Sequence, residues 1–516
     1  MKAITHNFWG SKYQIAVAAG ILAGISYPPF PFPLLMFPAF VLLIRLTDIA
    51  EGGRETAYFS FISFVIWNSI TTYWLSFATV AGGISAILAN AAIMTLPFLL
   101  IRHYVKAGRH PLLFALTVAS AWTIYEFLHY RWDLAWPWLS VANAFSNFVE
   151  IVQYISFSGS LGITFWVVFS SALIYRYLVS GNKTVLVFMS LSVLLPVFMS
   201  VFIYYNFQDR PDKTIQVVVV QPNHDSYQEL SGFSNTFDPL IELLKLSEKM
   251  ISSETQLVLW PENALLSGVH ENRPGSNDRY IISRVKDWGV PLITGAALYR
   301  YYEPGTEPAV YRQFNDSPPY NVYNSAVKYS TDGKISFYNK GKLVPVVERI
   351  PFVEQLKYIP VPGVDWSDIS GFGRGKDATI FRIDNTMTPA LICYDSVFPD
   401  WVRRFVIQGA GIITVITNDG WWGNTSGHIQ HYDFARLRAI ENRRAVIRSA
   451  NNGISGMILA NGDIHSKTEY WVQDVLQLSV PVYSDFTFYT KYGDLIGYFC
   501  MLGLIPGFIG RKSVKG

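Results

Sequence analysis

The sequence predicts a protein of two parts, a multi-span α-helical membrane domain followed by an α/β domain that lies outside the cytoplasm. Three observations predict this fold class. Half of the 516 residues are hydrophobic and only 15% are charged, which is the composition of a membrane protein. Long runs without any charge fill the first two hundred residues, as hydrocarbon requires. After about Phe207 the chain changes to β-rich runs that alternate with helical ones, as in a soluble domain.

Seven membrane spans are expected in the first domain, residues 1–207. No charge occurs from 13 to 44, and the stretch YPPFPFP at 27–33 divides that run into two spans joined by a tight turn. The uncharged run 56–101 is long enough for two more spans, with the linker SFATVAGG at 76–83 between them. The fifth, sixth and seventh spans are expected at about 110–128, 151–175 and 184–207, and an eighth at about 495–510. Seven such runs in succession argue against buried helices of a soluble protein.

The basic residues between the spans predict that the N-terminus is cytoplasmic. Arg102, Lys106 and Arg109 follow the fourth span, and alternate loops are rich in Lys and Arg whereas the others are nearly bare. Seven crossings then place the second domain, 208–490, on the outer side of the membrane. The segment 491–516 supplies the eighth span and returns the chain to the cytoplasm.

The second domain is expected to contain a sheet covered on both faces. Its β-rich runs include IQVVVVQ, TQLVLW, VPLITGAAL, TPALICY and GIITVIT, and DPLIELLKLSEKMISS is a helical run between two of them. Hydrophobic strands separated by helices predict this arrangement. The net charge is only +3 and no basic block occurs, so no nucleic-acid partner is expected. Cys393 and Cys500 lie in very different surroundings, and no disulfide is expected.

Three residues with useful chemistry lie at or beside the ends of predicted strands, where reactive groups gather in open α/β sheets. Glu262 follows TQLVLW, Lys340 lies in SFYNKGKLVPVVERIPF, and Cys393 closes TPALIC. A nearby carboxylate can take the proton of a thiol, and a lysine can stabilise the thiolate. The structural alternatives are a small buried cysteine, a helix-capping glutamate and a solvated lysine. Lys342 is a rival for the role of the lysine.

The motifs around these residues resemble the nitrilase superfamily. They are the glutamate in WPE, the lysine in Y-x-K-x-x-L-V-P with a second glutamate eight residues later, and the cysteine in a C-Y-acid motif. Joined to seven preceding spans and one following, they are similar to the apolipoprotein N-acyltransferase family, as are TNDGWWG at 417–423 and the stretch 436–455. The resemblance covers nearly the whole chain. It implies an αββα sandwich for the second domain and a bacterial inner-membrane protein whose catalytic domain is periplasmic.

The resemblance also implies an acyltransferase in which Glu262 is the general base, Lys340 holds the oxyanion and Cys393 is the nucleophile. The acyl chain of a phospholipid, expected to be phosphatidylethanolamine, would pass to the thiol and then to the α-amino group of the diacylglyceryl-cysteine of an apolipoprotein. No metal or other cofactor is expected, and His428 and His431 are interpreted as helix-surface histidines. The alternatives are a membrane-tethered nitrilase-like amidase or lipid deacylase, and an inert lipid transporter or scaffold.

Four supporting residues are expected around the three: Glu348, Asn324, Tyr394 and Asp395. Glu348 lies eight residues after Lys340 and is expected to orient it or share its charge. The sequence departs from the family pattern at three places. Asp395 replaces a glutamate, VPVVE replaces V-P-F-G-E before and at Glu348, and His129 replaces an arginine.

Six aromatic residues and one acid are the candidates for lipid contact: Trp421, Trp422, Phe398, Trp401, Trp136, Trp138 and Glu126. Trp136 and Trp138 follow the fifth span, at the headgroup level that tryptophans prefer. The other four aromatics follow catalytic-domain strands and are expected to face the bilayer as a mobile rim over the pocket. Glu126 lies near the outer end of its span and is either a functional acid or a buried partner of Arg131.

Overall fold

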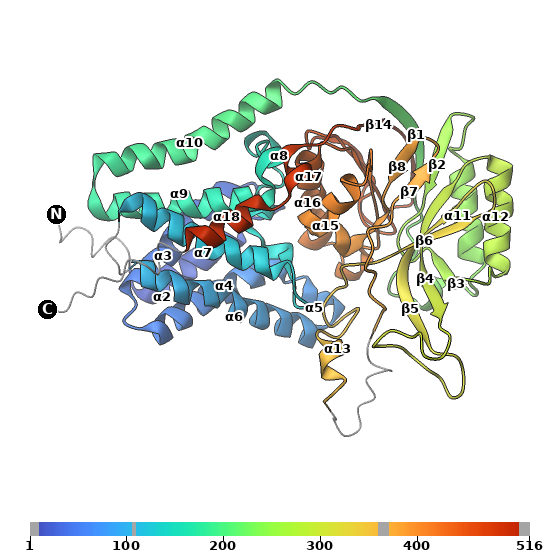
Figure 1. Cartoon of the computed structure of the whole chain (residues 1–516), viewed down its shortest axis with the longest axis horizontal. Helices are drawn as coiled ribbons and strands as arrows, with labels where there is room; N and C mark the ends of the chain where they lie inside the picture. The colour runs from blue at the N-terminus through green and yellow to red at the C-terminus, as the bar shows by residue number, and fades with distance from the viewer. Residues whose placement is uncertain (1–9, 106–109, 360–370, 505–516) are drawn as a thin grey trace.

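The computed structural model describes residues 10–105, 110–359 and 371–504. Figure 1 shows that the helices of the first two hundred residues form one half of the molecule and that the β-sheets form the other. Helix α18, which follows the last strand, returns to the helical half and packs against α7 and α9.

One helix lies at each of the eight predicted span positions in the described part of the chain. These helices are α2 (Lys12–Gly24), α3 (Met36–Ile49), α4 (Gly53–Thr72), α6 (Val80–Val105), α7 (Pro111–His129), α9 (Ser160–Ser180), α10 (Lys183–Tyr205) and α18 (Leu495–Gly503). Four of them, α6, α7, α9 and α10, are long and apolar enough to cross a membrane. The C-terminal part of the eighth predicted span lies outside the described residues.

The structure moves the bounds of three predicted spans. Helix α3 continues to Ile49, past the predicted end at Ile44, and Arg45 pairs with Asp48 on this added turn. The fourth span begins at Val80, inside the predicted linker. The sixth begins at Ser160 rather than 151, because short helices occupy the preceding segment. These short helices are η2 (Pro137–Leu139), η3 (Val141–Phe145), η4 (Val149–Ile151) and α8 (Ile155–Ser158); η1 (Pro33–Leu35) and α5 (Leu75–Ala78) lie in earlier connections.

The second half contains two sheets and a separate hairpin. The first sheet has the order β14–β1–β2–β4–β5–β6, with β3 paired to β4, and the second has the order β13–β12–β11–β10–β9. The strands of the first sheet are β1 (Lys213–Gln221), β2 (Thr255–Leu259), β3 (Leu265–His270), β4 (Leu292–Tyr301), β5 (Tyr320–Tyr329), β6 (Ile335–Asn339) and β14 (Asp474–Val482). Those of the second are β9 (Leu391–Ile392), β10 (Ile413–Thr417), β11 (Val446–Ala450), β12 (Gly456–Ile458) and β13 (Ile464–Lys467); β7 (Phe381–Ile383) and β8 (Thr386–Thr388) form the hairpin.

Strand β1 explains why one apolar run can serve two cores. Successive side chains of a strand point to opposite faces, and Val217 and Val219 join the core between the sheets, whereas Val218 and Val220 join the core under α11 and α12. Both faces of the sheet are therefore covered, which gives the predicted αββα sandwich. The helices of this half are α11 (Asp238–Glu248), α12 (Ser276–Trp288), α13 (Val353–Leu356), α15 (Pro399–Val406), α16 (Ser426–Asn442) and α17 (Phe488–Tyr492), with η5 (Glu229–Gly232), η6 (Cys393–Val397) and η7 (Gly420–Trp422).

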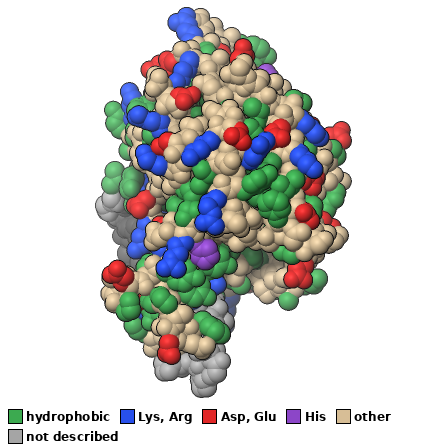
Figure 2. Space-filling model, turned by 90° about the vertical axis from the view of Figure 1, so that its right-hand side faces the viewer, with side chains coloured by type: hydrophobic (Ala, Val, Ile, Leu, Met, Phe, Trp, Pro, Cys, Tyr) green, Lys and Arg blue, Asp and Glu red, His purple; other side chains and the backbone are tan. Residues whose placement is uncertain are grey.

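The far end of the sandwich has the surface of a water-exposed domain. Figure 2 views the molecule from the side on which α11 and α12 lie, and Lys, Arg, Asp and Glu side chains are interspersed over that face. Mixed charges of this kind are typical of surfaces in contact with water. The membrane-embedded part of the chain is therefore the opposite, helical half.

Helix α16 belongs to the half that contains the sheets, and a buried ion pair connects it to the membrane helices. Arg438 donates to both oxygens of Glu441, at 2.6 and 2.9 Å. The N–H and the hydroxyl of Ser160, at the start of α9, donate to Glu441 Oε1 at 2.9 and 2.5 Å. A carboxylate at the N-terminus of a long helix satisfies free N–H groups and complements the helix dipole.

Gln430, also on α16, makes a second connection with its side-chain amide. Its Nε2 donates to the carbonyl oxygens of Pro28 (2.8 Å), in the connection after α2, and Thr71 (3.1 Å), in the last turn of α4. Its Oε1 accepts from the indole N–H groups of Trp138 (2.7 Å) and Trp74 (3.2 Å). One buried amide thus holds three separate segments of the membrane half against the half that contains the sheets.

Candidate active site

Cys393 lies where the second sheet presents the ends of its parallel strands. β9 pairs in parallel with β10, with Ile392 opposite Ile416, so Cys393 lies at the same edge as Thr417. The backbone of Cys393 has a φ of 45°, in the left-handed region that residues other than glycine rarely adopt. Such strain persists only where the surrounding structure enforces it, and it concentrates at functional sites. The half-buried thiol therefore marks the centre of the candidate site.

Glu262 follows β2 and is held from three directions. Its Oε1 accepts from Asn324 Nδ2 at 2.7 Å and lies 3.4 Å from Lys340 Nζ, while its Oε2 accepts from the N–H of Asn418 at 3.0 Å. Gly295 on β4 allows this loop to approach, because a Cβ there would lie 2.5 Å from the Cα of Glu262. The carboxylate is buried and its position is fixed.

Lys340 follows β6 and lies between two carboxylates. Its Nζ is 2.8 Å from Glu348 Oε1 and 3.4 Å from Glu262 Oε1. Asn324 Nδ2 also donates to Glu348 Oε1, at 3.0 Å, and so joins both acids. A lysine that is only 1% exposed needs such partners to stay charged. Of the two lysines in this loop, Lys340 and not Lys342 meets the glutamates.

The charges around the thiol determine its resting state. Burial raises the pKa of Cys393 well above the ordinary value, the charge of Glu262 raises it further, and Lys340 opposes both. Burial also raises the pKa of Glu262, against the effect of Lys340. Burial alone would lower the pKa of Lys340, but Glu262 and Glu348 outweigh it and raise that pKa well above its usual range. The thiol is thus protonated at rest and needs a base in order to react, and Glu262 is the candidate for that base.

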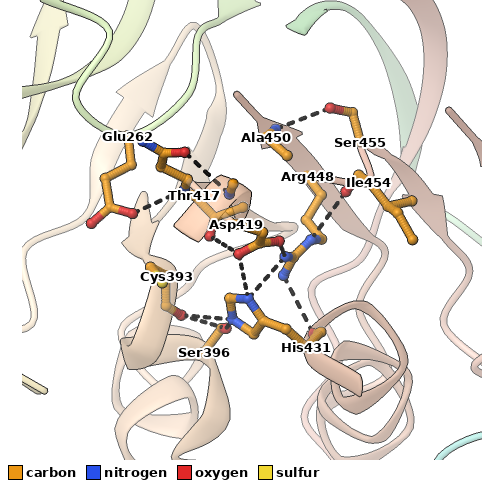
Figure 3. A network of polar contacts seen from close by, with 12 residues as sticks. Glu262, Cys393, Ser396, Thr417, Asp419, His431, Arg448, Ala450, Ile454 and Ser455 are labelled. Carbon is orange, nitrogen blue, oxygen red and sulfur yellow. Dashed lines mark hydrogen bonds and ion pairs between the residues drawn. The ribbon is translucent and has the colours of Figure 1, made fainter. Parts of the chain in front are cut away.

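A buried chain of polar groups supports the backbone of Cys393 from the other side (Figure 3). Arg448 donates to Asp419 Oδ2 at 2.7 Å, and Asp419 Oδ1 lies 2.9 Å from His431 Nδ1. His431 Nε2 lies 3.2 Å from the carbonyl oxygen of Cys393. Burial would raise the pKa of Asp419, but His431 and Arg448 outweigh it and hold that pKa well below its usual range. The ionised carboxylate of Asp419 thus holds the strained turn at the thiol in place through His431.

His428 and His431 are not surface histidines, which corrects the interpretation from their spacing. Both are buried, and the His428 ring stacks on Tyr470 with the ring centres 3.9 Å apart. Ligand atoms of Cys393, Asp419 and His431 lie within 4.8 Å of one another, close enough for a metal site. Arg448 already neutralises Asp419 there, so this donor set suits an ion pair better than a metal.

Replacing Asp419 with asparagine is expected to lower the free energy of unfolding by about 3 kcal/mol, because Arg448 would be left buried without a counter-charge. Thermal unfolding of the full chain in detergent measures the effect. Asp332→Asn is the matched control, since Asp332 lies on an exposed turn, paired with exposed Lys334, and the expected change is within about 0.5 kcal/mol. Equal unfolding temperatures for the two variants would contradict the structural role of Asp419.

The side chains of two of the four residues expected to support the site contact the central ones, and those of the other two point elsewhere. Glu348 and Asn324 contact Lys340 or Glu262 directly. Asp395 instead accepts from the N–H of Lys342 (2.8 Å) and the hydroxyl of Tyr338 (2.7 Å), and burial raises its pKa to about 6.

Tyr394 points toward the membrane half. Its hydroxyl donates to the carbonyl oxygen of Ala135, and its ring stacks on Trp136 with the ring centres 5.8 Å apart. The departures from the family pattern have local effects. Glu348 still reaches Lys340 although Val346 takes a φ of 68°, and His129 accepts from the N–H of Trp136 at 3.2 Å.

The aromatic candidates for lipid contact do not form one exposed rim. Trp421 is 45% exposed, but Phe398 and Trp401 are buried, because they fill the space between η6, α15 and the loop of Lys342. Trp422 is half-buried against Trp74, with ring centres 4.7 Å apart. The expectation that all four face the bilayer is therefore wrong for Phe398 and Trp401.

Trp136 and Trp138 lie at the contact between the halves. Their rings stack at 5.7 Å, and Trp138 is buried. Glu126 is also buried, and it accepts from five groups at 2.7–3.4 Å. Those donors are Trp122, Tyr130, Ser140, Val141 and Thr164. Arg131, the partner considered for Glu126, pairs instead with Asp494 at 2.6 Å.

Two family models match the chain, one for each half. Residues 217–482 match the carbon-nitrogen hydrolase model, and residues 19–173 match the model of the apolipoprotein N-acyltransferase N-terminal domain. The first match covers more than half of the chain, which therefore belongs to the carbon-nitrogen hydrolase family of the nitrilase superfamily. The second match places it, more narrowly, among the apolipoprotein N-acyltransferases of that superfamily.

Relatives align along nearly the whole chain. The apolipoprotein N-acyltransferase of Chlorobaculum tepidum is 28% identical, over 95% of this chain and 94% of that protein. The enzyme of that name from Rhizobium rhizogenes is 28% identical over 98% of both chains. That of Borreliella burgdorferi is 25% identical over 93% of this chain and 92% of its own.

Proposed function

We propose that the protein transfers an acyl chain from a phospholipid to the N-terminal amino group of a diacylglyceryl-cysteine apolipoprotein, through a thioester on Cys393. The observation that carries the proposal is the buried Lys340, held between Glu262 and Glu348 beside a strained, half-buried thiol. The printed names of the full-length relatives supply the substrate class. Phosphatidylethanolamine is the proposed donor.

In the first half-reaction Glu262 accepts the thiol proton, and the sulfur of Cys393 attacks an ester carbonyl of the phospholipid. Lys340 and the backbone N–H of Tyr394 stabilise the oxyanion, and one such donor contributes about 3 kcal/mol to the transition state. The carbon–sulfur bond forms and the ester carbon–oxygen bond breaks. Glu262 returns the proton to the leaving alkoxide, which departs as a lysophospholipid.

In the second half-reaction the α-amino group of the apolipoprotein attacks the thioester carbonyl. Glu262 accepts a proton from the amine, the carbon–nitrogen bond forms, and the carbon–sulfur bond breaks. The proton passes to the sulfur and restores the thiol. Because both substrates use one site in turn, the kinetics are ping-pong. The catalytic half is proposed to lie on the periplasmic side of the bacterial inner membrane, where lipoprotein precursors present their amino groups.

Intact mass spectrometry of the purified chain tests the proposal in two stages. Mixing with phosphatidylethanolamine is expected to add the mass of one acyl chain, and a diacylated lipopeptide is then expected to remove it and gain it as an amide. In a lipid deacylase or amidase, water would instead hydrolyse the thioester. The added mass would then be lost at the same rate with and without the lipopeptide. An inert transporter or scaffold would never gain it.

A further inference from the structure

A small cavity lies where the end of α7 meets the catalytic half. Its volume is about 40 Å³, and it is lined by Tyr130, Arg131, Lys342, Phe398, Pro399, Asp400, Trp401 and Arg404. Tyr130 and Arg131 directly follow α7, which is long and apolar enough to cross a membrane. The end of such a helix lies at the level of the lipid headgroups. The cavity therefore lies at the depth of lipid phosphates.

The cavity has an excess of positive charge. Arg131 pairs with Asp494 at 2.6 Å, and Arg404 pairs at 3.2 Å with Asp400, which also pairs with Arg403 at 2.9 Å. Lys342 is different, because no carboxylate of the described residues lies within ion-pair distance of its Nζ. The cations of the lining thus outnumber the carboxylates that pair with them, and Lys342 has no such partner.

Lys342 is also held in surroundings that do not favour its charge. Its Nζ lies 4.8 Å from the ring centre of Phe398 and 5.6 Å from that of Trp401. Burial, followed by the neighbouring Arg404, lowers the pKa of Lys342 to about 8. Aromatic faces only partly replace the water that an ammonium group loses. An anion in the cavity would supply the missing partner.

The cavity is joined to the candidate active site by short segments of the chain. Lys342 lies two residues after Lys340, and its N–H donates to Asp395, two residues after Cys393. Phe398 belongs to the turn that begins at the same thiol. An anionic group held by Lys342 would therefore be part of a molecule that reaches the thiol.

We propose that this cavity binds the phosphodiester of the acyl-donor phospholipid and that Lys342 is its principal cation. The inference rests on the proposed function and extends that function by naming the residue that selects the donor. A phosphodiester carries one negative charge close to its glycerol esters, so binding it here presents an acyl ester to Cys393. Free phosphate has the same chemistry, but the position of the cavity at the end of a membrane span favours the lipid.

The test compares two donors that differ in the phosphoethanolamine headgroup, which contains the phosphodiester. Acylation of Cys393 is measured by intact mass in mixed detergent micelles, with phosphatidylethanolamine or with diacylglycerol of the same acyl chains, each below saturation. In Lys342→Glu the ratio of the two rates, phospholipid over diacylglycerol, is expected to fall about tenfold or more, because a charge-assisted contact is lost. Lys342→Arg is expected to keep the ratio within about threefold of the wild type, since the charge stays.

Lys334→Glu is the matched control, because Lys334 lies on an exposed turn of the first sheet and its reversal changes the net charge equally. An unchanged ratio in Lys342→Glu would overturn the inference. Acylation that requires added inorganic phosphate would assign the cavity to the free ion and overturn it as well. If the wild-type chain forms no thioester from either donor, the proposed function fails first, and the two failures are thus distinguishable.

Discussion

Replacing Cys393 with alanine is expected to abolish both the acyl-enzyme and the transfer of the acyl chain, by a factor on the order of 10⁵ or more. The thioester requires the sulfur of Cys393, and neither Glu262 nor Lys340 can form it. The rate of amide formation on a diacylated lipopeptide, together with the intact mass after incubation with phospholipid, measures the loss.

Cys500→Ala is the matched control for this variant, because Cys500 is the other cysteine of the chain and is buried in α18. Incubation of Cys500→Ala with phospholipid is expected to add the same acyl mass, and in this variant Cys393 supplies the one remaining thiol. An acyl mass on Cys393→Ala, or its loss in Cys500→Ala, would contradict the assignment of the nucleophile.

Replacing Lys340 with methionine is expected to slow acylation of Cys393 roughly 10³-fold. Loss of one oxyanion donor costs about 10²–10³-fold by itself. The substitution also leaves the buried Glu262 and the half-buried Glu348 close together without a cation, and one of two such carboxyl groups takes up a proton. A protonated Glu262 cannot act as the base. Loss of the oxyanion donor and loss of the base therefore both slow acylation. Single-turnover acylation, followed by intact mass, gives the rate.

A second variant separates chemistry from folding. Lys340→Met alone leaves uncompensated buried charge and destabilises the chain, whereas Lys340→Met combined with Glu348→Gln removes one charge of each sign. The double variant is expected to unfold closer to the wild-type temperature and to remain as slow as the single one. Lys334→Met, on an exposed turn, serves as the control. Acylation by Lys340→Met within tenfold of the wild type would refute the role of Lys340.

The sequence allowed the main features to be predicted because they depend on local patterns. Uncharged runs have the length of the bilayer, so the helix at each predicted span could be located from hydropathy, whereas the short helices between the spans could not. Glu262 and Lys340 follow β2 and β6 of the first sheet, Cys393 follows β9 of the second, and reactive side chains gather at strand ends. The bounds of α9 were missed because its predicted span included the apolar segment before Ser160, which forms separate short helices.

The supporting network could not be predicted because its members are distant in sequence. Asp419, His431 and Arg448 come from a loop, a helix and a strand, and nothing in their spacing shows that they meet. Helix α16 was misread because it is buried on nearly every side, so its polar residues do not mark a solvent face. Likewise, Arg131 and Asp494 pair across 363 positions, a distance at which single-sequence reasoning has no signal.

The side chain of Gln430 makes the catalytic sandwich dependent on the bilayer-embedded part. Its carboxamide is fully used by two indoles and two carbonyl oxygens that all belong to the other half. A fragment cut free after α10 would leave that amide without those partners and would bare the apolar surface around Trp422. Expression of the sandwich as a stand-alone domain would therefore require redesign of this face, and the chain must be inserted and folded as one unit.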